Sequence, residues 1–129
     1  MSDAIGAGGD VAAMAARLEE IPTATIYDVL DERGLGDRCC LDHGIRPLVP
    51  GARRAGPAFT VRWVRDPRPA REWRPAMLPR ISDYFAPVTP GDIVVVDGGG
   101  DDATGQWGEM LSTMSWRAGA RGVVVGGGT

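Results

Sequence analysis

The sequence predicts an α/β fold, and the part of the chain between residues 92 and 127 is the basis of this prediction. Residues 92–98 (DIVVVDG) and 121–127 (RGVVVGG) contain continuous β-branched runs, typical of strands buried on both faces of a parallel sheet. Residues 108–118 (GEMLSTMSWRA) lie between these runs and repeat their apolar side chains at helical spacing. Strand, helix and strand in this order predict a parallel βαβ unit near the C-terminus, with a right-handed crossover.

The first third of the chain predicts two short helices. Asp10 is placed to cap a helix whose apolar side chains recur at helical spacing as far as Leu18, and Pro22 ends it. The run TATIYDVLDERG predicts a second helix, in which Thr25 and Asp28 have the spacing of a capping box. We interpret both helices as packing elements.

The middle of the chain predicts one strand and then an irregular segment. Residues 57–64 (PAFTVRWV) alternate apolar and polar side chains, as a half-buried strand does. Residues 65–80 are rich in proline and arginine and have no clear period, which predicts an irregular excursion that ends in a short helix over residues 81–88. A length of 129 residues predicts a single domain, residues 1–129.

Composition excludes several kinds of chemistry. All 14 basic residues are arginine, so the chain has no lysine for a Schiff base or for a Walker A loop. A net charge of -3 without a basic patch argues against a nucleic-acid partner. The first twenty residues have neither a cationic start nor a long apolar run, so we expect no signal peptide, no membrane partner and a cytoplasmic protein.

The glycine-rich corner after residue 97 leads into the predicted helix, and a helix N-terminus after such a loop favours an anionic ligand. The P-loop template fails at Gln106 and Trp107, where lysine and serine or threonine are required. The dinucleotide fingerprint has only a loose match here, without its later acidic residue. The string VVVDGGGDD is similar to a methyltransferase signature, which leaves a methyl donor and a small acid as the main candidates.

The strings EEIPTATIYDVLDERG, GIRPLVPGARRAGPAFTVR, PGDIVVVDGGG, WGEML and RGVVVGGG, taken in order, point to one family. From about Leu18 to Thr129 the chain resembles the family of 4-hydroxy-4-methyl-2-oxoglutarate aldolase and the regulator of ribonuclease E activity A. Members of this family are often labelled demethylmenaquinone methyltransferase-like.

This resemblance implies a swivelling α/β/β/α fold, assembled as a homotrimer or hexamer with active sites between subunits. It implies a lyase that uses magnesium or manganese to cleave 4-hydroxy-2-oxo acids to pyruvate, or to decarboxylate oxaloacetate. Such a protein binds a small 2-oxo acid as substrate. The alternative within the family is a non-catalytic regulator that docks on a ribonuclease.

The resemblance also assigns site residues. It implies that the backbone amides of Trp107, Gly108, Glu109, Met110 and Leu111 hold the substrate carboxylate. Glu109 falls on the family's functional acid, which holds a metal-bound water or takes part in proton transfer; alternatively, Glu109 only complements the helix N-terminus. Three further carboxylates in the loop either cap and solvate it or bind a hard cation, namely Asp97, Asp101 and Asp102.

The family's arginine-aspartate pair would begin directly after Thr129. In the family that arginine holds and polarises the substrate, and that aspartate is the direct protein ligand of the metal. We therefore expect the 129 residues to be the N-terminal part of the family fold, without its C-terminal elements, and to have weak or no lyase activity.

Overall fold

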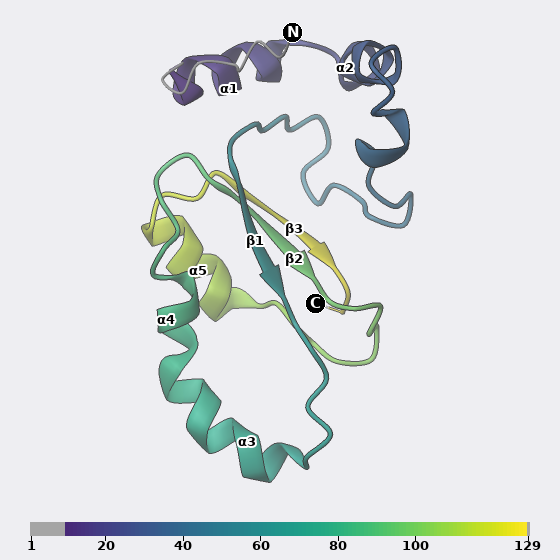
Figure 1. Cartoon of the computed structure of the whole chain (residues 1–129). Helices are drawn as coiled ribbons and strands as arrows, with labels where there is room; N and C mark the ends of the chain where they lie inside the picture. Colours follow the sequence, from purple (N-terminus) through teal and green to yellow (C-terminus); the bar gives the residue numbers. More distant parts are fainter. Residues whose placement is uncertain (1–9, 129) are drawn as a thin grey trace, which may run out of the picture. The chain divides into compact units, whose positions relative to one another are not determined.

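The computed structural model describes residues 10–128, and the chain divides into two compact units, residues 1–56 and 57–129. The described part of the first unit contains two helices and one turn of 3-10 helix: α1 (Val11–Glu20), α2 (Thr23–Asp31) and η1 (Gly36–Arg38). Figure 1 shows these elements at the purple end of the colour range. A 3.0 Å hydrogen bond from the amide of Ala55 to Oε1 of Glu19 links the end of this unit to α1.

The start of α1 agrees with the prediction made from the sequence, whereas the start of α2 does not. Oδ1 of Asp10 accepts a 3.1 Å hydrogen bond from the amide of Ala13, so the predicted cap is confirmed. Helix α2 begins at Thr23, two residues before the predicted capping box, and its N-cap is Pro22 with no side-chain cap. The proline φ of -56° suits a helix entry without a capping side chain.

The second unit is the α/β part of the molecule. Its elements in chain order are β1 (Ala58–Arg62), α3 (Ala70–Met77), η2 (Leu78–Arg80), α4 (Ile81–Phe85), β2 (Ile93–Asp97), α5 (Glu109–Arg117) and β3 (Gly122–Gly126). The strands form a sheet in the order β1-β2-β3, and both pairs of neighbours are parallel. The predicted α/β class and the predicted parallel βαβ unit, β2-α5-β3, are therefore confirmed.

The core lies between the sheet and the helices of this unit. Val94 in the central strand is fully buried and is paired in register with Phe59 and Val123. The buried core also contains one side chain from each covering helix, Phe85 of α4 and Leu111 of α5. Val94 and Val96 of β2 are buried beneath these helices, whereas the alternate residues Ile93 and Val95 are partly exposed, so the burial of this strand on both faces that the sequence predicts is not found within the described residues.

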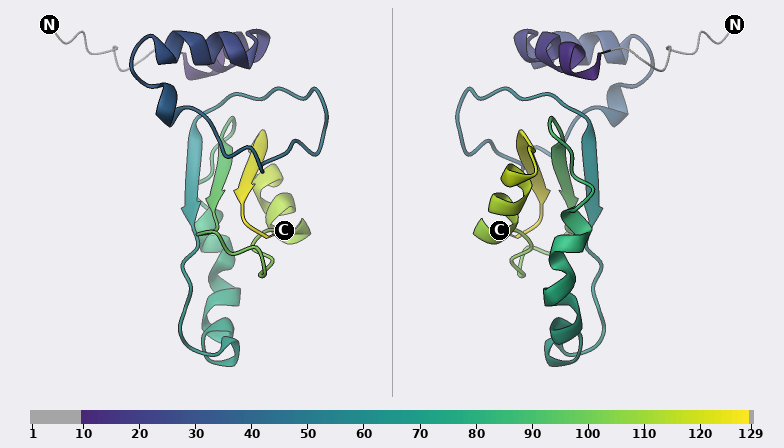
Figure 2. Two further views of the ribbon diagram at one scale, coloured as in Figure 1. Left: turned by 90° about the vertical axis from the view of Figure 1, so that its right-hand side faces the viewer. Right: turned by 90° about the vertical axis from the view of Figure 1, so that its left-hand side faces the viewer.

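Figures 1 and 2 show α4 and α5 on the same face of the sheet. Both crossovers step in the same direction, from β1 to β2 and from β2 to β3. Two crossovers of the same hand that step in the same direction place their helices on the same face. All three strands end at one edge of the sheet, and the loop between β2 and α5 begins there.

One segment departs from the sequence prediction. Residues 65–80 were expected to be irregular, but α3 and η2 occupy residues 70–80, and Pro75 lies inside α3. Pro75 has no N–H for the helical hydrogen-bond ladder, yet α3 continues past it to Met77. The short helix expected over residues 81–88 is found as α4, but it ends at Phe85, three residues before the predicted end. No helix within residues 10–128 is long and apolar enough to cross a membrane.

Candidate functional site

The candidate site lies at the carboxyl edge of the sheet, where parallel α/β folds place their ligand-binding loops. Asp97 ends β2 and shapes the loop that follows it. Its Oδ1 accepts a 2.9 Å hydrogen bond from the amide of Gly99, and its Oδ2 lies 3.1 Å from Nε of Arg62 at the end of β1. Asp97 therefore serves as a cap of the glycine corner and pairs with the neighbouring strand.

Asp101 closes the next turn of the same loop. Its Oδ1 accepts hydrogen bonds from the amides of Ala103 at 2.9 Å and Thr104 at 3.2 Å. Hydrogen bonding from the Thr104 side chain and from the Ala103 amide holds the pKa of Asp101 below its usual value. The carboxylate is thus used to stabilise the loop.

The described residues do not assemble a metal site by themselves. No three histidine, cysteine, aspartate or glutamate side chains within residues 10–128 are grouped so that they could hold a metal ion. Asp97 and Asp101 already accept hydrogen bonds from the loop, and Glu109 is exposed at the start of α5. Asp97 and Asp101 therefore fit the capping alternative better than a hard-cation site, whereas Asp102 is exposed.

The N-terminus of α5 presents unpaired amides at this edge. Gly108 is the N-cap residue and has an extended backbone, and no side chain caps the helix. The first helical hydrogen bond runs from the amide of Ser112 to the carbonyl of Gly108 at 3.0 Å. The amides of Glu109, Met110 and Leu111 precede that bond and have no acceptor within the described residues. Their arrangement suits a carboxylate or another small anion.

The side chains around these amides serve packing. Trp107 lies against the ring of Phe85 in an edge-to-face arrangement, with ring centroids 5.7 Å apart. Leu111 belongs to the buried core, whereas Met110 is 54% exposed. The resemblance assigns Trp107, Gly108, Glu109, Met110 and Leu111 to substrate binding through their backbone amides, and these side-chain positions are compatible with such a role.

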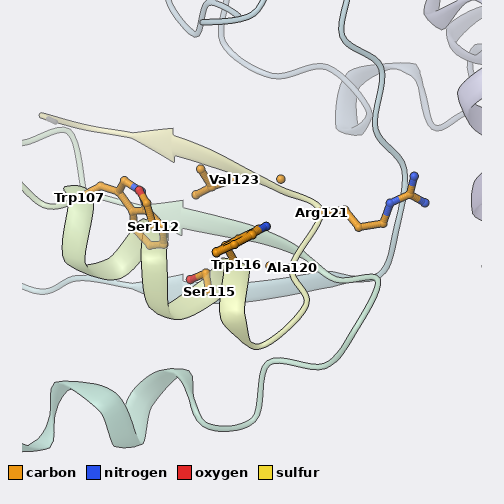
Figure 3. A pocket seen from close by; sticks show the side chains of 8 residues that line it. Trp107, Ser112, Ser115, Trp116, Ala120, Arg121 and Val123 are labelled. Atoms are coloured by element: carbon orange, nitrogen blue, oxygen red, sulfur yellow. The ribbon is translucent and has the colours of Figure 1, made fainter.

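A separate depression of about 190 Å³ lies along α5 and β3 (Figure 3). Trp107 and Ser112 line one end, Trp116 lies in the middle, and Arg121 extends away at the other end. Ser115 is 4% exposed, and its hydroxyl has no hydrogen-bond partner within the described residues. Among the described residues that line this depression, Arg121 alone is charged, so the depression is a poor candidate for the binding of a small acid.

The sequence pattern gave Gln106 no role beyond a mismatch to the P-loop. The backbone amide of Gln106 donates a 2.8 Å hydrogen bond to the carbonyl of Gly128, and so ties the loop after β2 to the end of β3. From the sequence, a glutamine within a glycine-rich loop is expected to be exposed to solvent. Its half-buried position is visible only in three dimensions.

Comparison with known proteins gives a consistent family. A family model described as RraA-like, Aldolase/RraA, matches residues 23–129. Protein DlpA of Legionella pneumophila subsp. pneumophila is 28% identical over 105 residues, which cover 81% of this chain and 16% of DlpA. An uncharacterized protein from Pseudomonas syringae pv. tomato str. DC3000 has a solved structure that matches with a TM-score of 0.67 and 25% identity.

The match to the Pseudomonas structure covers 98% of this chain and 53% of that one. The chain thus spans about half the length of the solved relative and a smaller part of DlpA. The family model, in contrast, includes all three strands, α5 and the loop between β2 and α5. Because this match extends over most of the sequence, the chain belongs to the Aldolase/RraA family.

Proposed function

We propose that this chain binds the carboxylate of a small 2-oxo acid and contributes to a lyase site. One observation supports the proposal most directly: the amides of Glu109, Met110 and Leu111 are unpaired at an uncapped helix N-terminus, at the carboxyl edge of a parallel sheet. The family includes aldolases, whose substrates have a carboxylate next to the reacting carbonyl. A carboxylate is a natural ligand of such amides.

The proposed reaction is the cleavage of a 4-hydroxy-2-oxo acid to pyruvate, or the decarboxylation of oxaloacetate. In both reactions a carbon–carbon bond breaks, and its electron pair moves into the enolate of pyruvate, which is then protonated. The other fragment leaves as carbon dioxide in the decarboxylation, or as a carbonyl compound in the retro-aldol cleavage, where the 4-hydroxyl group loses its proton. These 129 residues contain no lysine, so none of them can form a Schiff base as the electron sink. The amides of α5 orient the substrate, and Glu109 at the same helix end is the proposed proton-transfer or water-holding group.

Magnesium or manganese is the proposed cofactor, on the basis of the family resemblance. Glu109 is the residue proposed to contact the ion, through water, and the direct aspartate ligand is expected beyond Thr129. We also propose a homotrimer or hexamer, which sedimentation velocity would distinguish from a monomer.

Oxalate, which resembles the enolate of pyruvate, is a suitable probe of the proposed site. In ¹H–¹⁵N spectra, titration with oxalate in the presence of magnesium is expected to shift the amide resonances of Glu109, Met110 and Leu111. Amides on the outer face of α3, such as that of Arg71, serve as the internal reference. A titration in which the resonances of the three α5 amides do not shift at millimolar oxalate would contradict the proposed site.

Substitution of Glu109 separates the lyase from the ribonuclease regulator. Glu109→Gln is expected to lower metal-dependent pyruvate release by about a hundredfold or more, because a general acid or base is lost. Glu72→Gln is the matched control, since Glu72 lies in the first turn of α3 as Glu109 does in α5. Equal loss in both variants would point to helix stability instead. A regulator would keep its ribonuclease binding in both variants.

A further inference from the structure

The side-chain amide of Gln106 occupies the glycine corner itself. Its Nε2 donates hydrogen bonds to the carbonyl oxygen of Gly98 at 3.0 Å and to that of Asp101 at 3.3 Å. Both partners are backbone carbonyls, which can only accept, so the orientation of the amide group is fixed. The nitrogen is the atom that faces these carbonyls, and Oε1 is buried without a hydrogen-bond partner within the described residues.

Oε1 of Gln106 points at two glycines, Gly98 and Gly127. A Cβ atom built on Gly98 would overlap Oε1, and one built on Gly127 would lie 2.7 Å from it. Neither glycine has a positive φ, so backbone conformation does not demand glycine at these positions. At Gly127 the need for glycine comes mainly from the glutamine side chain, whereas a Cβ on Gly98 would also lie 2.5 Å from the backbone carbonyl oxygen of Gly126.

Backbone hydrogen bonds join the same two strand ends. The amide of Gly98 donates to the carbonyl of Gly126 at 2.9 Å, and the amide of Gly128 donates to the carbonyl of Asp101 at 3.1 Å. A third hydrogen bond of this group runs from the backbone amide of Gln106 to the carbonyl of Gly128. Gln106 thus links the end of β2, the loop and the end of β3, and two residues separate it from Glu109, the first residue of α5.

We propose that Gln106 is a positioning residue: it sets the orientation of the unpaired amides of α5 relative to the carboxyl ends of β2 and β3. In this arrangement the side chain of Gln106 fills the glycine corner. The anion binds outside the corner, at the N-terminus of α5. The effect on ligand binding rests on the proposed function. The effect on the conformation of the α5 amides does not.

Gln106→Glu tests this role with a side chain of nearly the same shape. An ionised carboxylate cannot donate to the carbonyls of Gly98 and Asp101, whereas the protonated acid can donate to one of them. At pH 8 the variant is expected to shift the amide resonances of Glu109, Met110 and Leu111 and to weaken oxalate binding about tenfold. At pH 5 both changes are expected to diminish, because burial beside two carbonyls favours the protonated form.

The wild-type chain, measured at both pH values, is the reference for these changes. Unchanged α5 amide resonances in Gln106→Glu at pH 8 would overturn the proposal. Shifted resonances that recover at pH 5 support it, even in a protein that binds no oxalate. Failure of wild-type binding would count against the proposed function alone.

A pair of substitutions keeps the test valid if Gln106→Glu folds poorly. Gly127→Ala introduces a Cβ against Oε1, and is expected to disturb the α5 amides in the wild-type background. In the Gln106→Ala background the same substitution is expected to have little further effect, because the clashing atom is gone. Gly105→Ala is the control, since a Cβ there meets nothing within 4 Å. Additive effects of Gly127→Ala and Gln106→Ala would overturn the proposal.

Discussion

The indole nitrogen of Trp107 donates a 2.8 Å hydrogen bond to the hydroxyl of Ser112, and that hydroxyl donates to the carbonyl of Gly108 at 2.9 Å. The two bonds fasten the residue before the helix to the first turn of α5. The tryptophan ring is also held from the core side by Phe85. The conformation at the start of α5 is therefore specified by side chains on both sides of the N-cap.

Removal of the shared hydroxyl tests this arrangement. Ser112→Ala leaves the indole N–H without its partner, and is expected to lower the free energy of unfolding by about 0.5–1.5 kcal/mol. The indole N–H resonance of Trp107 should shift in the same variant. Thr113→Ala, at an exposed position of the same helix, is the control, and the indole N–H resonance of Trp107 should stay unchanged in that variant. An unchanged Trp107 resonance in Ser112→Ala would show that the bond does not persist in solution.

The turn between α5 and β3 makes a second prediction. Gly119 has a φ of +95°, and a Cβ at this position would lie 2.8 Å from Cα of Pro90. Gly119→Ala therefore combines a left-handed backbone with a backbone clash, and is expected to cost about 2–4 kcal/mol in urea unfolding. Gly105→Ala, in open space and without a positive φ, should stay within about 1 kcal/mol of the wild type. Similar costs for both would contradict this account.

Asp92, at the entry to β2, makes a third prediction. It is 7% exposed, and its Oδ2 accepts hydrogen bonds from the amide of Thr89 at 2.7 Å and from its hydroxyl at 3.0 Å. Asp92→Ala leaves both donors unpaired in a buried turn, so the free energy of unfolding should fall by about 1–3 kcal/mol. Asp92→Asn retains one acceptor oxygen and should cost less. Asp83→Ala, on an exposed side chain, is the control, and calorimetry would compare all three.

The depressed pKa of Asp101 predicts an acid-dependent stability. A carboxyl whose folded pKa lies below its unfolded value, about 3.9 for aspartate, stabilises the fold above that unfolded value. This contribution is lost as pH falls through the folded pKa. The stability difference between wild type and Asp101→Asn should therefore shrink as pH is lowered from 5 to 2. Thr104→Val, which removes the hydroxyl donor, should reduce the same pH dependence. A difference that is constant across this range would refute the prediction.

The strands β2 and β3 could be predicted from sequence because each contains a run of β-branched residues. Residues 93–96 and 123–125 have β-branched side chains without polar interruption, and this composition favours a strand wherever the run lies in the sheet. The helix α5 was equally predictable, since its apolar spacing and Gly119 as its end are local features. In contrast, α3 could not be predicted from sequence, because residues 65–80 are rich in arginine and proline and show no apolar period over so short a helix.

The candidate site was only partly predictable. The uncapped start of α5 after a glycine loop is visible in the sequence, and that pattern by itself indicates an anionic ligand. The role of Gln106 is not visible there, because it depends on contacts with Gly98 and Gly127, which lie at the ends of different strands. A glycine-rich corner of this kind suggests the close approach of a ligand, whereas the space beside these two glycines is filled by a glutamine.

The order of the strands also has a consequence for the behaviour of the protein in concentrated solution. Within residues 10–128, β3 is paired on one side alone, and its sequence, GVVVG, has no charge, proline or bulge of the kind that protects exposed strand edges from self-association. Val123 is 41% exposed along this edge. A free edge of this composition can template hydrogen bonding to a strand of another molecule, so solubility is expected to depend on whatever covers β3.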